Sequence, residues 1–149
     1  MIIEAANVGD LPAVLALLQQ NRLPLDGVAD HLETMVVARQ DGRVVGTAAL
    51  ELYADGALLR SVAVDPPLQG QGLGHELTNA ALRMAIGLDI RTVFLLTTTA
   101  ERFFPKFGFE RIQRDDVPDS VRAAVEFTAA CPETAVVMRK RVGSETRAR

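Results

Sequence analysis

The sequence has a single cysteine, Cys131, and this scarcity limits its covalent chemistry. One cysteine allows no disulfide within the chain, so the cysteine content gives no support for secretion. The first residues, 1–4, lack the basic, apolar and small-residue order of a signal peptide. No apolar run reaches the ~20 residues that span a bilayer, because Arg60 and Arg83 interrupt the two longest candidates. These absences predict a cytoplasmic protein that does not act in a membrane.

A surplus of basic residues is also missing. The chain carries 16 Lys and Arg against 19 Asp and Glu, a net charge of −3, whereas general nucleic-acid binders usually need a basic surplus to displace counterions. Its 48% hydrophobic and 23% charged residues exclude intrinsic disorder for most of the chain. With 149 residues it can bury a core without a metal or a disulfide. We therefore expect one domain over 1–149, no metal, and a frayed polar tail at 143–149.

The spacing of apolar residues predicts the elements of the first half. Asp10 is a good N-cap for a run with helical spacing, and Asp41-Gly42 supplies the positive φ of a tight hairpin turn. The predicted elements are a strand at 2–6, a helix at 10–20, a loop or broken helix at 21–30, and strands at 35–39, 44–53 and 57–64. The last three form an antiparallel meander because short turns join them.

The second half changes period after Pro66-Pro67. The predicted elements are a helix of about four turns at 73–88, a buried strand at 92–98, a helical patch at 100–107 that ends at Gly108, strands at 109–114 and 135–141, and a helical segment near 118–129. A meander followed by a long helix and a helix-linked strand predicts a single α/β domain. Its central sheet should be mixed and mostly antiparallel, with flanking helices.

The most informative stretch runs from Val62 to His75 and reads Val-Ala-Val-Asp-Pro-Pro-Leu-Gln-Gly-Gln-Gly-Leu-Gly-His. It places a glycine-rich turn between a strand and a helix, where backbone N–H groups and the helix dipole can bind a phosphate. A dinucleotide fingerprint needs glycine or alanine at the position of His75, so a nucleotide-dependent oxidoreductase is disfavoured. A P-loop needs Gly-Lys followed by Ser or Thr, which is absent. The remaining simple alternative is that the glycines only form a tight turn.

Gln-x-x-Gly-x-Gly, from Gln69 to Gly74, resembles the acetyl-CoA motif of the GNAT superfamily of N-acetyltransferases. The order of strands and helices over 1–141 and the late turn at 106–109, Lys-Phe-Gly-Phe, are also similar to that family. The resemblance implies acetyl-CoA as the cosubstrate and direct attack of a small molecule's amine on the thioester. It also implies a sheet that splays open between the strand ending at Val64 and the strand starting near Thr92.

The resemblance assigns the cofactor to two neighbouring segments. It places the pantetheine arm along Val62, Ala63 and Val64, with the Val62 N–H polarising the thioester carbonyl. It places the pyrophosphate against the backbone amides of Gln69, Gly70, Gln71, Gly72, Leu73, Gly74 and His75. We expect Gly72 to serve the ligand's approach and not the fold, so that Gly72→Val would weaken cofactor binding in a nearly intact protein.

Phe104 departs from the family pattern. Many relatives have a tyrosine before the late turn, where its hydroxyl can protonate the departing thiolate, and phenylalanine cannot donate a proton. Water or another side chain then serves, or protonation matters little because CoA is a good leaving group. Phe104 is expected to pack in the core or against the pantetheine. Its presence also motivates the alternative of a catalytically silent acyl-CoA-binding or regulatory domain.

The stretch 95–104, Leu-Leu-Thr-Thr-Thr-Ala-Glu-Arg-Phe-Phe, resembles the same region in N-acetylglutamate synthase acetyltransferase domains and in the arsenic-resistance N-acetyltransferases. The resemblance implies an amino acid or a similar small molecule as acceptor, not a protein terminus or a polyamine. The sequence leaves open which amine is used and whether the chain forms a homodimer.

Glu51 and Arg60 interrupt two apolar strands, and burying either charge unpaired would be unfavourable. One interpretation is a cross-strand ion pair. The other is catalytic: Glu51 acts as a base through water, and Arg60 binds a substrate carboxylate. Strand alternation predicts that Arg60 shares a face with Val62 and lies opposite Leu59.

Three further residues have simple structural interpretations. We expect His31 in a surface loop, Arg122 in a local helical pair with Glu126, and Cys131 as an ordinary buried cysteine with no catalytic partner.

Overall fold

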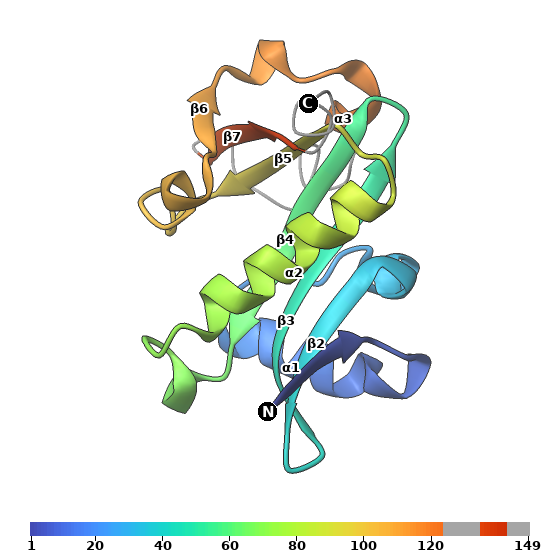
Figure 1. Cartoon of the computed structure of the whole chain (residues 1–149), viewed down its shortest axis with the longest axis vertical. Coiled ribbons are helices and arrows are strands. Elements are labelled where there is room, and N and C mark those ends of the chain that lie inside the picture. The colour runs from blue at the N-terminus through green and yellow to red at the C-terminus, as the bar shows by residue number, and fades with distance from the viewer. Residues whose placement is uncertain (124–134, 143–149) are drawn as a thin grey trace.

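The computed structural model describes residues 1–123 and 135–142. This part of the chain forms one mixed sheet in the order β1-β2-β3-β4-β5-β7-β6 (Figure 1). The strands are β1 (Ile2–Ala5), β2 (Met35–Gln40), β3 (Arg43–Tyr53), β4 (Gly56–Val64), β5 (Thr92–Thr97), β6 (Glu110–Ile112) and β7 (Val136–Arg141). The α-helices are α1 (Leu11–Gln20), α2 (Leu73–Gly87) and α3 (Asp119–Arg122). Short 3-10 helices are η1 (Val8–Asp10), η2 (Val28–Thr34), η3 (Pro66–Leu68), η4 (Phe104–Phe107) and η5 (Arg114–Asp116).

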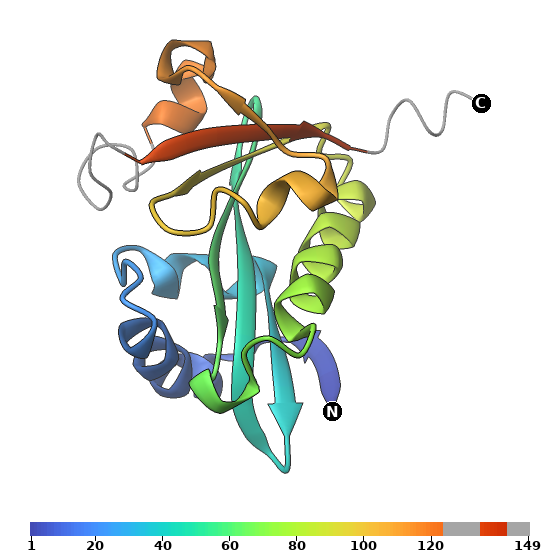
Figure 2. The ribbon, with the colours of Figure 1, turned by 90° about the vertical axis from the view of Figure 1, so that its left-hand side faces the viewer.

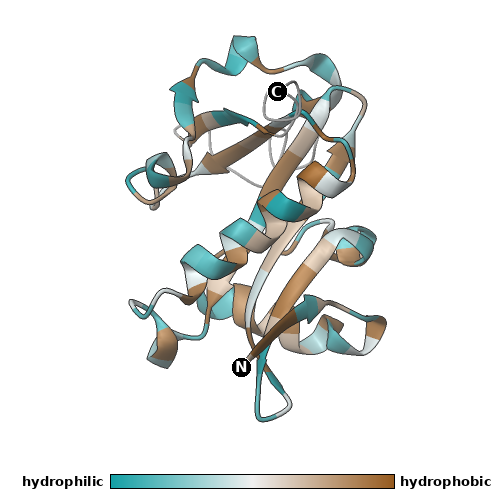
Figure 3. Ribbon diagram, in the orientation of Figure 1, coloured by the Kyte–Doolittle hydropathy of each residue, from teal (hydrophilic) through white to brown (hydrophobic). Residues whose placement is uncertain are grey.

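Helices cover both faces of the first four strands, with α1 and η2 on one face and α2 on the other (Figure 2). Helix α2 forms because Leu73, Leu77, Ala81 and Ala85 recur at helical spacing, and all four are buried against the sheet. Its outward face is largely hydrophilic (Figure 3). The predicted α/β fold and antiparallel meander are confirmed.

The sheet opens between β4 and β5, as predicted. These two strands run parallel but pair only at Ala57 with Val93 and at Leu58 with Phe94. Past Leu58, β4 pairs with no other strand of the described ranges on this side, whereas β5 pairs along its whole length with β7. The open part of β4 therefore starts just before Arg60 and continues to Val64.

A bulge in β4 overturns the expectation that Arg60 and Val62 share a face. Ser61 has φ 59°, and the register with β3 shifts at this point. The bulge reverses the alternation of side chains, because an extra residue occupies one strand. Val62 accordingly packs on the α2 side with Leu59, and Arg60 lies on the opposite face.

The C-terminal part has most of the elements that the sequence predicted. β6 and β7 form the predicted antiparallel pair, and Gly108 ends η4 with φ 96°. The predicted helix at 100–107 is reduced to the 3-10 turn η4, and only α3 is described from the segment 118–129. Glu126, Cys131 and the tail 143–149 lie outside the described residues. Arg122 donates to Asp119 at 2.8 Å, and its predicted pairing with Glu126 is not tested.

A partly exposed ion pair connects the start of α1 to the sheet. Arg39 of β2 donates to both carboxylate oxygens of Asp10, each at 2.8 Å, and also to Glu4. The hydrogen bond from Arg39 holds the pKa of Asp10 below its usual range. In the described ranges, no helix is both long and apolar enough to cross a bilayer.

Candidate active site

The glycine-rich turn connects η3 to α2. Gly70 and Gly72 have φ of 80° and 91°, a conformation that favours glycine, and Gly72 is the N-cap of α2. No side chain caps the first turn of α2, so its backbone N–H groups remain available to an anion. Our expectation that Gly72 serves only the ligand is wrong, because its φ would strain any L-residue even though a Cβ there meets no atom within 4 Å.

A cavity of about 610 Å³, here called the loop cavity, lies between this turn, the open part of β4 and the segment before η4. Six of the residues that the resemblance assigns to the cofactor line it: Val62, Ala63, Val64, Gln69, Gly74 and Phe104. The remaining five, Gly70, Gln71, Gly72, Leu73 and His75, do not line it. Leu73 instead packs in the core, and the His75 ring lies 4.7 Å from that of Phe107, centroid to centroid.

A second cavity of about 360 Å³, here called the splay cavity, lies where β4 and β5 separate. Its wall combines residues 22–24 after α1, residues 59–62 of β4, residues 95–100 of β5 and the following turn, and Phe104. Five residues line both cavities: Val62, Thr98, Thr99, Ala100 and Phe104. The two cavities therefore meet over the bulged part of β4.

Among the described residues of its wall, the splay cavity has positive charge and no negative charge. Arg22 is exposed at its wall, with φ 58°, and Arg60 lines it from below. No Asp, Glu or His is among its lining residues. Threonine hydroxyl groups from positions 97–99 add neutral hydrogen-bonding capacity. The charge of this described wall therefore favours an anionic molecule over a polycation.

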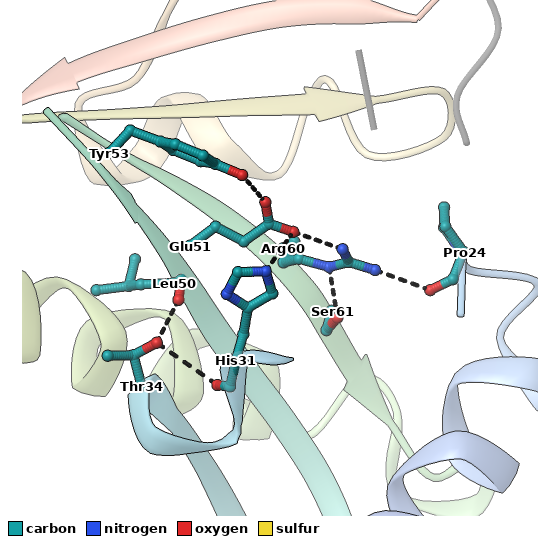
Figure 4. Close-up of polar contacts among 8 residues, drawn as sticks. All are labelled: Pro24, His31, Thr34, Leu50, Glu51, Tyr53, Arg60 and Ser61. Atoms are coloured by element: carbon teal, nitrogen blue, oxygen red, sulfur yellow. Dashed lines mark hydrogen bonds and ion pairs between the residues drawn. The ribbon is translucent and has the colours of Figure 1, made fainter. Parts of the chain in front are cut away.

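Arg60 and Glu51 form a buried ion pair next to this cavity (Figure 4). Arg60 Nη1 donates to Glu51 Oε2 at 2.5 Å, and both side chains are 1% exposed. Tyr53 donates its hydroxyl hydrogen to the other carboxylate oxygen of Glu51. His31 Nε2 lies 3.4 Å from Glu51 Oε2, because η2 carries this residue back over the sheet.

These contacts favour one of the two interpretations of Glu51 and Arg60. Glu51 does not line either cavity, and its carboxylate is engaged by three side chains. Arg60 lines the splay cavity, but its Nε donates to Ser61 Oγ and its Nη2 donates to the Pro24 carbonyl, both at 3.2 Å. The geometry supports the ion pair over a base and a carboxylate ligand. The expectation of a surface-loop His31 is wrong, since its side chain is only 23% exposed and contacts this pair.

Asn21, which lines the loop cavity, contacts both β4 and the glycine-rich turn. Its side-chain amide donates to the Val64 carbonyl at 3.3 Å, and Gln69 Nε2 donates to the same carbonyl at 3.0 Å. Gln69 Nε2 also lies 3.1 Å from Asn21 Oδ1. The segment after α1 is therefore attached to the glycine-rich turn.

Sequence reasoning missed Arg22, Thr98 and Thr99 as wall residues. The signal for Arg22 was weak: it is a lone cation beside Pro24 in a segment predicted to be a loop, and such loops often line sites. Nothing local indicates that this loop lines the same cavity as β5, because that depends on how the sheet opens.

The splayed sheet and the glycine-rich turn define the class of the protein. Residues 31–111, more than half of the chain, match the model of an acetyltransferase (GNAT) domain, and the chain therefore belongs to the GNAT acetyltransferase family.

Relatives of known name make the resemblance more specific. The chain is 33% identical over 132 residues to the amino-acid acetyltransferase of Mycobacterium tuberculosis, covering 80% of this chain and 74% of the relative. It is 30% identical over 129 residues to the amino-acid acetyltransferase of Neisseria meningitidis, of which it spans only 30%.

Solved structures show the same arrangement. N-acetylglutamate synthase from Neisseria gonorrhoeae, complexed with coenzyme A and N-acetyl-glutamate, superposes with a TM-score of 0.83 at 25% identity, covering 96% of this chain and 35% of that one. A Mycobacterium tuberculosis protein in complex with CoA and NLQ gives a TM-score of 0.81 at 26% identity, covering 95% and 99%.

Proposed function

We propose that this protein transfers the acetyl group of acetyl-CoA to the amine of a small, anionic, amino-acid-like molecule. The observation that carries the proposal is the meeting of the two cavities over Val62. The loop cavity leads from the uncapped N-terminus of α2 to the open part of β4, and the splay cavity continues beyond it. An acyl donor in one and an amine in the other would meet at the five shared residues.

The donor site is supported by family membership and by the loop geometry. The solved relatives described above contain coenzyme A, and the turn at 69–74 presents backbone N–H groups with the positive end of the α2 dipole. Val62 lies in the stretch of β4 that has no partner strand in β5, and it lines both cavities. We assign to its N–H the hydrogen bond that stabilises negative charge on the thioester oxygen.

The acceptor is proposed from charge and size. A polyamine would need carboxylates in the wall, whereas the described lining of the splay cavity includes Arg22 and no Asp or Glu. A volume of about 360 Å³ suits one amino acid and not a peptide segment. Arg22 can pair with an acceptor carboxylate, which would orient the amine toward Val62. Both relatives identified by sequence above are named amino-acid acetyltransferases, which agrees with this choice.

The described wall of the splay cavity has no carboxylate base, so the proton must leave by another route. The amine attacks the thioester carbon, the carbon–sulfur bond breaks, and the amine loses one proton while the thiolate leaves. Phe104 cannot donate to that thiolate, and the hydroxyl groups common to both cavities belong to Thr98 and Thr99. We propose that these two hydroxyls hydrogen-bond the reacting groups or the water that carries the proton.

A thiol-release assay tests the proposal. Acetyl-CoA is supplied with glutamate, other amino acids, phosphinothricin-like and arsenical analogues, polyamines or peptides. We expect CoA release with anionic amino acids or analogues, and the analogue arm tests the arsenic-resistance resemblance. Release with polyamines or peptides alone would contradict the acceptor class. Tight acetyl-CoA binding by calorimetry with no release for any amine would favour the silent acyl-CoA-binding domain.

A further inference from the structure

Arg60 is held in place by the protein on all sides. Its three guanidinium nitrogens donate to Glu51, to Ser61 and to the carbonyl of Pro24 (Figure 4). Glu51 is in turn held by Tyr53 and by His31. A guanidinium with this many protein acceptors cannot turn toward a substrate without leaving a buried carboxylate uncompensated. The role of Arg60 must therefore be sought in what it holds.

What Arg60 holds is the segment between α1 and η2. Within this segment the backbone hydrogen bonds are local, from Arg22 N to Gln19 O at 3.1 Å and from Leu23 N to Leu18 O at 3.0 Å. Two long-range hydrogen bonds lie on either side of Arg22: Asn21 donates to the carbonyl of Val64, and the Pro24 carbonyl accepts from Arg60. Arg22 thus lies between two residues, Asn21 and Pro24, that hydrogen-bond to β4.

A contribution to the free energy of unfolding does not by itself explain the Glu51–Arg60 pair. A buried ion pair usually contributes little compared with apolar residues of similar volume, because both charges lose their hydration. Its value here is geometric, since a planar guanidinium donates in fixed directions. A methionine at position 60 would fill the same space but could not donate to Pro24.

We propose that the Glu51–Arg60 pair is a positioning device for acceptor binding: Arg60 fixes the Pro24 carbonyl and so holds Arg22 at the wall of the splay cavity. Glu51, assisted by Tyr53 and His31, fixes the guanidinium. This inference rests on the proposed function for the role of Arg22, but not for the attachment of the segment. Arg60 and Glu51 are positioning residues that act through residues 22–24.

The test uses a paired variant, Glu51→Leu with Arg60→Met, which removes both charges together so that the fold survives. Tyr53 and His31 are only half-buried, so the polar atoms released by the change can reach water. We expect the acceptor KM to rise about tenfold, with kcat and acetyl-CoA affinity within about twofold of wild type. Amide hydrogen exchange at Arg22 and Leu23 should accelerate in the free protein.

A matched control removes the other arginine pair, Asp10→Asn with Arg39→Met, which lies away from both cavities. It should change neither the acceptor KM nor exchange at Arg22. In an Arg22→Met background, the paired variant should add no further increase in KM if Arg60 acts through Arg22. Additive effects, or a folded paired variant with unchanged KM and exchange, would overturn the proposal.

The experiment distinguishes failure of the proposed function from failure of this inference. If the wild-type protein acetylates no acceptor, the KM arm is lost, but the exchange arm still decides. Faster exchange at residues 22 and 23 in the paired variant and not in the control would support the attachment, whereas unchanged exchange would refute it.

Discussion

The loop cavity and the splay cavity meet at five residues, yet they are built from different materials. The loop cavity depends on backbone: a stretch of β4 that pairs with no described strand on one side, and the first turn of α2, where Gly74 lines the wall. The splay cavity depends on side chains brought from three distant segments, with Arg22 supported by the buried pair below it. A site built from backbone should be sensitive to added volume and indifferent to charge. A site built from side chains should show the reverse.

The largest expected effect is on the support beneath the splay cavity. Arg60→Met leaves Glu51 buried with its charge uncompensated by an arginine, and we expect a loss of about 3–5 kcal/mol in the free energy of unfolding. The paired variant with Glu51→Leu should recover most of this loss. Urea unfolding of the single and paired variants measures both values. Equal stability of the two variants would mean that the charges are not coupled.

The next largest effect should come from added volume in the loop cavity, which should weaken acetyl-CoA binding. Gly74 is helical, lines that cavity, and a Cβ there would lie 3.6 Å from Phe103 Cζ and 3.8 Å from Val64 Cγ2. Gly74→Leu keeps the helix, because leucine is a good helix former, but fills the cavity. We expect acetyl-CoA affinity to fall about a hundredfold, roughly 2.7 kcal/mol. Calorimetry measures it, with Gly87→Leu at the far end of α2 as control. Normal binding by a folded Gly74→Leu protein would displace the cofactor from this cavity.

Removing the charge of Arg22 should weaken acceptor binding in the splay cavity and leave cofactor binding in the loop cavity intact. Arg22→Met should raise the acceptor KM about thirtyfold and leave acetyl-CoA affinity unchanged, because a charge-assisted hydrogen bond is lost. Arg22 and methionine suffer similar strain at φ 58°, so stability should hardly change. Steady-state kinetics measures the acceptor KM. Arg83 is an exposed arginine on α2, and Arg83→Met is the control variant. A change in cofactor affinity without a change in acceptor KM would reverse the assignment of the cavities.

The smallest effect concerns a region outside both cavities. Arg39 lowers the pKa of Asp10, so this carboxylate contributes stability above its unfolded-state pKa of about 3.9 and loses that contribution as pH falls through the lower folded value. Asp10→Asn should therefore reduce the acid-side loss of unfolding free energy, as measured by urea titrations between about pH 2 and pH 6. Neither cofactor affinity nor acceptor KM should change at neutral pH. An altered KM would show that the segment before α1 influences the splay cavity.

The two cavities also differed in how far the sequence predicted them. Five residues of the loop-cavity wall lie within 62–74, between a predicted strand and a predicted helix, so this side of the cavity could be predicted together with the fold. The bulge at Ser61 has no comparable signal, and it placed Val62 on the unexpected face. Two alternatives for Glu51 and Arg60 could be stated but not decided, because the answer depended on His31 and Pro24 from another segment.

The five residues shared by the cavities have a consequence for the donor itself. A chain longer than acetyl on the thioester would have to extend past Val62 and Phe104 into the space that the acceptor needs. The same protein would therefore be expected to bind longer acyl-CoA molecules without using them, and to be inhibited by them in competition with the acceptor. Acyl-chain selectivity would then need no dedicated pocket, since the second substrate's own volume sets the limit.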